Sequence, residues 1–208
     1  YLHIANLEFA LGVAYFQGKY IDKDIKKASI CWKSMLKRNV NEYSSIEDAR
    51  NVLGSVGGAY IGKSIAISVN GIKNYEIKVR KNLKLGYEFL EKAREYGDAD
   101  SLFWLAEMYE KGEYVEKDFF HAVQLYEQAE KNGVDEATVW IKENKTVVEL
   151  IDEIVEISKA TEYNDKLWCR IYKIFEEAPQ FPEVLRCVYL LYPVIKNYDT
   201  EENCYSRN

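Results

Sequence analysis

The chain has 208 residues, a net charge of −6, 48% apolar residues and 30% charged residues. This apolar content is too high for a disordered chain, and no apolar run is long enough for a membrane-spanning helix. The acidic balance argues against binding to nucleic acid, which requires a basic face. The three prolines, Pro179, Pro182 and Pro193, all lie near the C-terminal end, so the preceding part is expected to be mainly helical.

The first segment predicts two helices joined by a turn. A large apolar residue, a small residue and a tyrosine follow helical spacing in the first helix: Leu11, Gly12 and Tyr15. Gly18 suits the left-handed position that ends this helix, and Asp24 suits the N-cap of the second. The second helix contains a small residue, Ala28, and an aromatic residue, Trp32, one turn later.

A second pair follows after an insertion around Val40 to Asp48. The insertion contains Ser44-x-x-Glu47, a capping-box spacing, which predicts a short loop and an early start to the next helix. We call the positions that recur from one pair to the next the repeat columns. The residue types of the first pair recur in these columns at Val56, Gly57 and Tyr60, then at Asn82, Gly86, Leu90, Ala93 and Gly97.

An inserted segment, about 64–79, divides the second pair. Apolar residues alternate on both sides of Asn70-Gly71, at Ile65, Ile67 and Val69, then at Tyr75, Ile77 and Val79. Alternation around Asn-Gly predicts a β-hairpin, which would project from the turn between the two helices. The hairpin either packs on its own repeat or contacts a partner.

The third copy is the clearest, and it sets a period of 36 residues from Gly97 to Gly133. Its columns are Leu105, Ala106, Tyr109, Gly112, Asp118, Ala122 and Tyr126. A fourth copy reaches Ile141 and then departs from the pattern, because Lys142 replaces the small residue. Repetition at this length is typical of stacked helical hairpins.

The pattern stops at Thr146. Three apolar stripes follow, within 147–157, 167–175 and 184–192, and then a polar tail. We expect residues 146–208 to form a helical cap and a polar tail, because the last unit of a solenoid must cover an exposed core face. The alternative is that the stripes form a docking surface.

These columns resemble the Sel1-like repeat, with Ser101 to Tyr126 as the clearest copy. The resemblance covers about residues 5–144. It implies an all-α fold, a right-handed α/α superhelix over residues 1–145 that carries the inserted hairpin and ends in the C-terminal cap. It also implies a non-catalytic scaffold that binds another protein. Cysteine-rich secreted relatives pair two cysteines in each repeat, a pattern that this chain lacks.

No motif for catalysis, phosphate binding or metal binding is present, so no cofactor and no metal are predicted. The chain has two histidines, and His121 is expected to be a structural residue of a second helix. The cysteines are Cys31, Cys169, Cys187 and Cys204. They fit small buried side chains and one thiol in the tail, or a disulfide between Cys169 and Cys187, which would imply an oxidising compartment.

The aromatic residues outside the repeat columns predict the contact surface. By resemblance, first helices line the concave face of such superhelices, which would bring together Phe103, Trp104, Glu107, Trp140 and Glu143. Tryptophan anchors dominate binding energy at interfaces, and the carboxylates favour a basic partner surface. Asn70 and Tyr75 of the hairpin complete the predicted partner-binding set. The alternative is that the chain itself buries both indoles.

Several roles stay open at this point. Within the resembling family, a bacterial immunity or inhibitor protein for a secreted toxin fits a small acidic chain without an active site. The other readings are a hydrolase acting on a cell-wall or antibiotic substrate, and an assembly factor of a membrane-associated complex. The sequence starts at Tyr1, so a removed leader peptide and a shortened chain are both open. The compartment, bacterial cytoplasm or periplasm, is therefore undecided.

Overall fold

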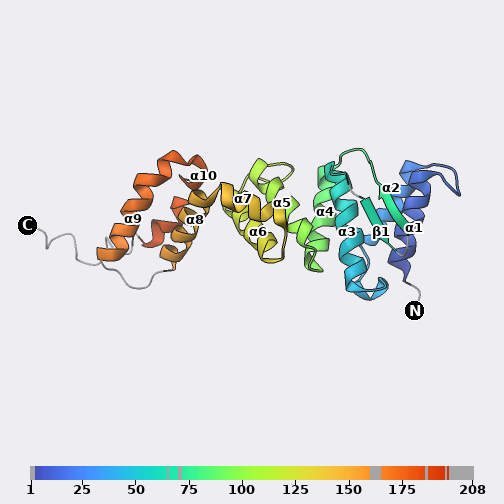
Figure 1. Cartoon of the computed structure of the whole chain (residues 1–208), viewed down its shortest axis with the longest axis horizontal. Helices are drawn as coiled ribbons and strands as arrows, with labels where there is room; N and C mark the ends of the chain where they lie inside the picture. Colours follow the sequence, from blue (N-terminus) through green and yellow to red (C-terminus); the bar gives the residue numbers. More distant parts are fainter. Residues whose placement is uncertain are drawn as a thin grey trace, which may run out of the picture.

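The computed structural model describes residues 3–64, 66–69, 72–159, 165–185, 187–194 and 196. Its helices follow one another along the long axis of the molecule, with α1 and α2 at one end and α8, α9 and α10 at the other (Figure 1). The two helices of each pair pack against each other, α1 on α2, α3 on α4 and α5 on α6. The predicted fold class is confirmed, because stacked helical pairs form an α/α superhelix.

The repeat part contains seven α-helices among the described residues. These are α1 (Ile4–Gln17), α2 (Ile25–Met35), α3 (Ile46–Ile61), α4 (Leu83–Glu95), α5 (Ala99–Lys111), α6 (Phe119–Lys131) and α7 (Asp135–Glu143). The C-terminal part contains α8 (Lys145–Ser158), α9 (Asp165–Glu177), α10 (Pro182–Leu185) and the 3₁₀ turns η2 (Ala178–Gln180) and η3 (Val188–Leu191). The third predicted C-terminal helix is thus divided into α10 and η3.

The predicted helix ends are confirmed. The side chains of Asp24, Asn82 and Asp118 accept backbone amides three residues ahead, at 3.0, 3.1 and 2.9 Å. Each bond satisfies a donor that the first turn of a helix leaves unpaired. Gly18 and Gly112 adopt φ angles of 69° and 70°, in the left-handed region that ends α1 and α5.

The small residues of the first helices allow close packing of the second helices. A Cβ atom on Gly12 would lie 2.2 Å from Nε1 of Trp32, and one on Gly57 would lie 2.9 Å from the Leu90 side chain. Trp32 and Leu90 are fully buried at these contacts. The glycines are therefore required by the approach of two helices rather than by backbone conformation.

Leu11 differs in burial from Val56 and Leu105, the large apolar residues at the same position of the next two repeats. Val56 and Leu105 in the same column are fully buried, whereas Leu11 is 45% exposed. It shares an exposed face of α1 with Ile4 and Leu7. Since α1 is the first described helix of the stack, no preceding described repeat covers this face.

The insertion before α3 begins with the 3₁₀ turn η1 (Val40–Glu42). The predicted cap at Ser44 was wrong by one residue, because Ser45 is the N-cap of α3 and accepts the Asp48 amide at 3.0 Å. The Ser44 hydroxyl donates to the Asp48 carboxylate instead. Two serines in succession offer equivalent side chains, so the sequence alone does not select between them.

Two short strands, β1 (Ala66–Val69) and β2 (Ile72–Glu76), pair antiparallel in the segment between α3 and α4. Ala66 pairs with Glu76 and Ile67 with Tyr75, and the register shifts between Ile67 and Val69. Asn70 and Gly71, the predicted turn, lie outside the described residues. Ile77, directly after β2, is buried in the core formed by the first two helical pairs.

The apolar core consists of three clusters, in the first two pairs, the third pair and the C-terminal part. Phe119 and Val123 of α6 belong to the C-terminal cluster together with Ile151 and Ile154 of α8. The C-terminal helices therefore cover α6, as a cap would. The boundary between the array and the cap at residue 145 stays a prediction. None of the described helices combines the length and apolarity needed to cross a membrane.

Candidate protein-binding surface

Two of the predicted aromatic residues meet on a third that belongs to the repeat core. The Phe103 ring on α5 meets Tyr126 on α6 edge-on, with ring centres 5.4 Å apart. The Trp140 indole on α7 stacks on the other side of the same cluster, 3.9 Å from Tyr126 and inclined by 21°. Tyr126 is fully buried, while Phe103 and Trp140 are half-buried. We call Phe103, Tyr126 and Trp140 the aromatic cluster.

Tyr126 is held in place by its hydroxyl. The hydroxyl donates to Oε2 of Glu110 at 2.7 Å, which pairs a polar group that packing would otherwise leave unsatisfied. Burial and the neighbouring Glu110 carboxylate raise the pKa of Tyr126 far above its ordinary value, so the phenol stays protonated. The ring against which Trp140 stacks is therefore neutral and rigid.

Trp140 also links the repeats to the C-terminal helices. Its indole lies 6.0 Å from the Phe119 ring and packs against both the third-repeat core and the C-terminal core. Removal of this side chain would therefore weaken the junction as well as the surface. The alternative that the chain covers the indoles applies in part, since Trp104 and Trp140 are both half-buried.

Trp104 lies apart from the aromatic cluster. It packs against the core of the third repeat and keeps part of its indole accessible. Within the described part of the chain, no ring contact joins Trp104 to Trp140. The two indoles therefore offer separate anchors.

Glu107, one turn after Trp104 on α5, is engaged with two lysines. Its carboxylate accepts Nζ of Lys63 at 2.5 Å and Nζ of Lys111 at 3.1 Å. Burial by itself would raise the pKa of Glu107, but the two ammonium groups outweigh it and hold the pKa below 4.5. Sequence reasoning missed this, because Lys63 comes from the end of α3. Glu143, at the end of α7, is exposed.

The predicted contacts of the hairpin stay a prediction. Tyr75 lies on β2 opposite Ile67, which places its backbone but not its side chain. Asn70 lies outside the described residues. The structure joins Phe103 of α5 and Trp140 of α7 through Tyr126, and the role of the hairpin stays a prediction.

His121 and Cys187 are packed in the structure, whereas Cys169 is exposed. The His121 ring is half-buried and meets Tyr109 edge-on at 4.4 Å, as expected for a structural histidine. Cys169 is exposed and Cys187 is buried, and both are free thiols, so the disulfide considered for them is not formed. Across the described ranges, no group of histidine, cysteine and carboxylate side chains is placed to hold a metal ion.

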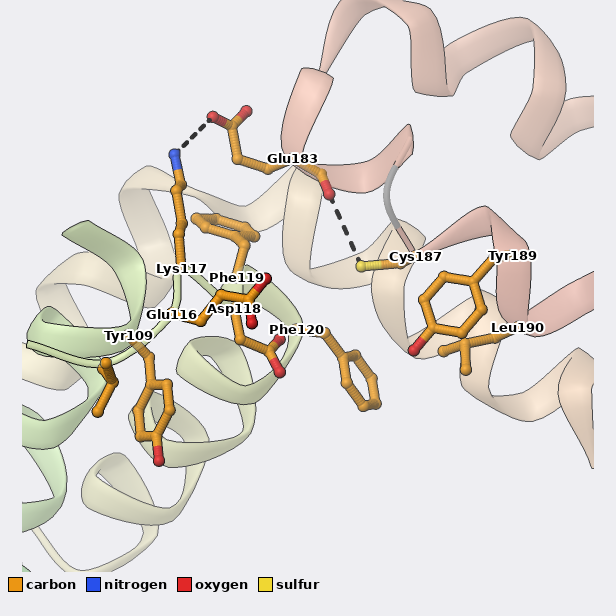
Figure 2. Close-up of a pocket in the computed structure, with 11 residues that line it drawn as sticks. Tyr109, Glu116, Lys117, Asp118, Phe119, Phe120, Glu183, Cys187, Tyr189 and Leu190 are labelled. Atoms are coloured by element: carbon orange, nitrogen blue, oxygen red, sulfur yellow. Dashed lines mark hydrogen bonds and ion pairs between the residues drawn. The ribbon is translucent and has the colours of Figure 1, made fainter. Parts of the chain in front are cut away.

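A pocket that the sequence did not predict lies between the third repeat and the C-terminal helices (Figure 2). It has a volume of about 560 Å³. The loop between α5 and α6 and the start of α6 form one side, and α10 and η3 form the other. The loop sequence Glu116-Lys117-Asp118 resembles Asp22-Lys23-Asp24 of the first repeat, so the sequence contained no signal that set this loop apart.

Comparison with known proteins supports the repeat assignment. The Sel1 repeat family matches residues 6–37, 72–98 and 99–134. A Sel1 repeat protein from Oxalobacter formigenes superposes with a TM-score of 0.46 at 20% identity, over 68% of this chain and 90% of that chain. A protective antigen present in uropathogenic Escherichia coli strains, which displays an SLR fold, gives 0.36 at 18% identity. That superposition covers 84% of this chain and 38% of the antigen. No curated protein matches the sequence.

The matched stretches agree with the structure. They correspond to the pair α1–α2, to β2 with α4, and to the pair α5–α6. Each stretch contains one of the second helices that Asp24, Asn82 and Asp118 cap. Repeats of this kind generally mediate protein–protein interaction, and residues 6–37, 72–98 and 99–134 of the chain are similar to the Sel1 repeat.

Proposed function

We propose that the chain is a non-catalytic scaffold that binds a partner protein through Phe103, Trp104, Glu107, Trp140 and Glu143. The observation that carries this proposal is the combination of half-buried indoles on a rigid helical framework. Trp104 packs against the core of the third repeat, Trp140 packs against the third-repeat and C-terminal cores, and each indole stays partly accessible. An aromatic anchor held in this way binds with a small loss of side-chain entropy.

Charge supports the choice of a basic partner. The chain carries a net charge of −6, and Glu143 is exposed at the end of α7, the helix that carries Trp140. Glu107 contributes less than its sequence position suggested, because Lys63 and Lys111 already neutralise it. The lysines could exchange for cations of a partner, which would make binding sensitive to salt.

One biological role of such a surface is the neutralisation of a secreted bacterial toxin by an immunity protein. An inhibitor of this kind needs a rigid acidic surface and no catalytic residues of its own. The hydrolase and assembly roles have no specific observation in their favour.

The test is capture of partners from the source cell by the immobilised chain. Trp104→Ala and Glu143→Lys should each reduce recovery of the captured protein, while Tyr20→Ala, at an 82%-exposed aromatic residue far along the stack, should not. Circular dichroism should show that all three variants are folded. Capture that is equal for all variants would refute the surface, and capture of nothing at micromolar protein would refute the function.

An immunity role makes a further demand. The captured protein should be toxic, and stoichiometric addition of the chain should suppress its activity with nanomolar affinity. A captured protein whose activity is unchanged by saturating chain would exclude this role and retain the scaffold function.

A further inference from the structure

The pocket between the third repeat and the C-terminal helices has an acidic side. Glu116 and Asp118 are exposed on the loop that begins α6, and Glu183 approaches from α10. Lys117 is the one cation among the described residues that line the pocket, and it forms an ion pair with Glu183 at 3.6 Å. One oxygen of Asp118 accepts the His121 amide and caps α6. Glu116 and Asp118 therefore leave a net negative charge at the pocket.

The charge of the Asp118 carboxylate affects a group on the opposite side of the pocket. Cys187, on the opposite side, is buried, and burial together with the Asp118 carboxylate raises the pKa of its thiol to about 11. A charge that influences a thiol on the other side of the space is also able to act on a cation placed between them.

Aromatic rings line the same space. Tyr109 and Phe120 extend from the third repeat, and Tyr189 and Leu190 lie on the opposite side, with the two loop carboxylates between the repeat's rings (Figure 2). Arginine and lysine side chains combine an apolar stem with a cationic head, and cations bind favourably to aromatic faces. The volume of about 560 Å³ accommodates such a side chain together with the adjoining backbone.

We propose that this pocket receives an arginine or lysine side chain from a basic segment of the partner protein. The proposal rests on the proposed function, because it assigns a second contact to the same partner. A segment is favoured over a small free cation because an exposed ring of η3 lines the pocket and a second exposed ring ends η3. Tyr189 is 70% exposed and Tyr192 is 64% exposed, and both would cover residues that flank the inserted side chain.

The test uses a short peptide, acetyl-Gly-Arg-Gly-Arg-Gly-amide, titrated into the isotope-labelled chain and followed by NMR. A second peptide carries citrulline in place of arginine, which keeps the shape and removes the charge. The arginine peptide should shift amide signals of residues 115–120 and 188–190, and the citrulline peptide should not. Shifts that are absent, scattered over the surface or equal for both peptides would overturn the proposal.

Matched variants separate the pocket from general acidity. The double variant Glu116→Gln/Asp118→Asn should weaken peptide binding about tenfold or more, because two charge-assisted contacts are lost. Asparagine retains the helix cap, so the fold should persist. The control Asp22→Asn/Asp24→Asn makes the same charge change at the corresponding positions of the first repeat, where Asp24 also caps a helix. Equal loss in both double variants would refute a specific pocket.

Two further arms identify the source of the cation and separate the two proposals. Spermidine that binds more tightly than the peptide would overturn the assignment to a protein segment. Partner capture that is lost in Trp104→Ala but unchanged in Glu116→Gln/Asp118→Asn would refute the pocket and leave the proposed function intact. Peptide binding at the pocket without capture of any protein would refute the proposed function and the assignment to a partner with it.

Discussion

Substitution of Gly12 by alanine tests whether close helix packing, rather than backbone freedom, requires the small residue of each repeat. The added Cβ would lie 2.2 Å from Nε1 and 2.5 Å from Cδ1 of Trp32. The Trp32 side chain is fully buried, and its Nε1–H donates to the Phe9 carbonyl at 3.4 Å. The indole would have to move by about 1 Å to restore a normal contact.

The expected cost follows from three contributions. Overpacking of a core side chain costs about 1–3 kcal/mol. Disturbance of the Trp32 hydrogen bond destabilises the fold by about 1 kcal/mol more. The better helix propensity of alanine offsets about 1 kcal/mol of this loss. We therefore expect Gly12→Ala to lower the free energy of unfolding by about 2 kcal/mol.

The third repeat suggests a compensating change, because it has Ala106 and Tyr126 in the columns of Gly12 and Trp32. A smaller aromatic ring should make room for the extra methyl group. Phenylalanine suits position 32 better than tyrosine, because the Tyr126 hydroxyl is paired with Glu110 and the first repeat has Phe16 at the corresponding position. In the Trp32→Phe background, Gly12→Ala should cost less than about 1 kcal/mol.

The assay is urea unfolding of the four proteins of this cycle, followed by circular dichroism at 222 nm. The coupling free energy between the two substitutions should be at least about 1 kcal/mol. Unchanged m-values would indicate that the denatured states are comparable. The reasoning is refuted if Gly12→Ala is as stable as the parent chain, or if it costs the same in both backgrounds.

Three further predictions concern caps, buried hydrogen bonds and ion pairs. Gly112→Ala should lower the free energy of unfolding by about 1 kcal/mol, because a φ angle of 70° is strained for a residue with a Cβ. A melting temperature equal to that of the parent chain would contradict this. Tyr43→Phe should lower the free energy of unfolding by about 1–2 kcal/mol, because the hydroxyl of Tyr43, a side chain that is only 2% exposed, donates to the Met35 carbonyl at 3.0 Å. An unchanged midpoint of urea unfolding would show that this hydrogen bond does not stabilise the fold. Glu107→Gln should cost less than about 1 kcal/mol at pH 7, because its lysine partners are partly exposed. The folded pKa of Glu107 lies below 4.5, so this stabilisation is present above the ordinary carboxyl value and disappears as pH falls through the folded pKa. A stability difference that stays constant from pH 7 down through this range would show that Glu107 does not act through its charge.

Part of the candidate surface was predictable and part was not. The period of the repeats places Phe103 and Trp104 on α5, and Trp140 on the corresponding face of α7. The stacking of Trp140 on Tyr126 was not predictable, because Tyr126 was assigned to the core of its own repeat. The neutralisation of Glu107 was also missed, since Lys63 lies 44 residues earlier in the chain.

The sequence by itself determined the features that depend on neighbours along the chain. Helix caps at Asp24 and Asp118, the left-handed Gly18 and Gly112, and the small residues opposite bulky ones are set within one turn or by the repeat period. Local hydrogen bonds and steric limits act over a few residues, so a periodic sequence displays them directly.

Tertiary structure alone decided which surfaces stay open. It left Leu11 exposed on α1, made Trp140 the link between two core clusters, and formed a pocket between Asp118 and Cys187. These features depend on how α6 packs against α8, α10 and η3, and the residues involved come from distant parts of the chain. Packing of such residues depends on the shapes of both sides, which the repeat pattern does not encode.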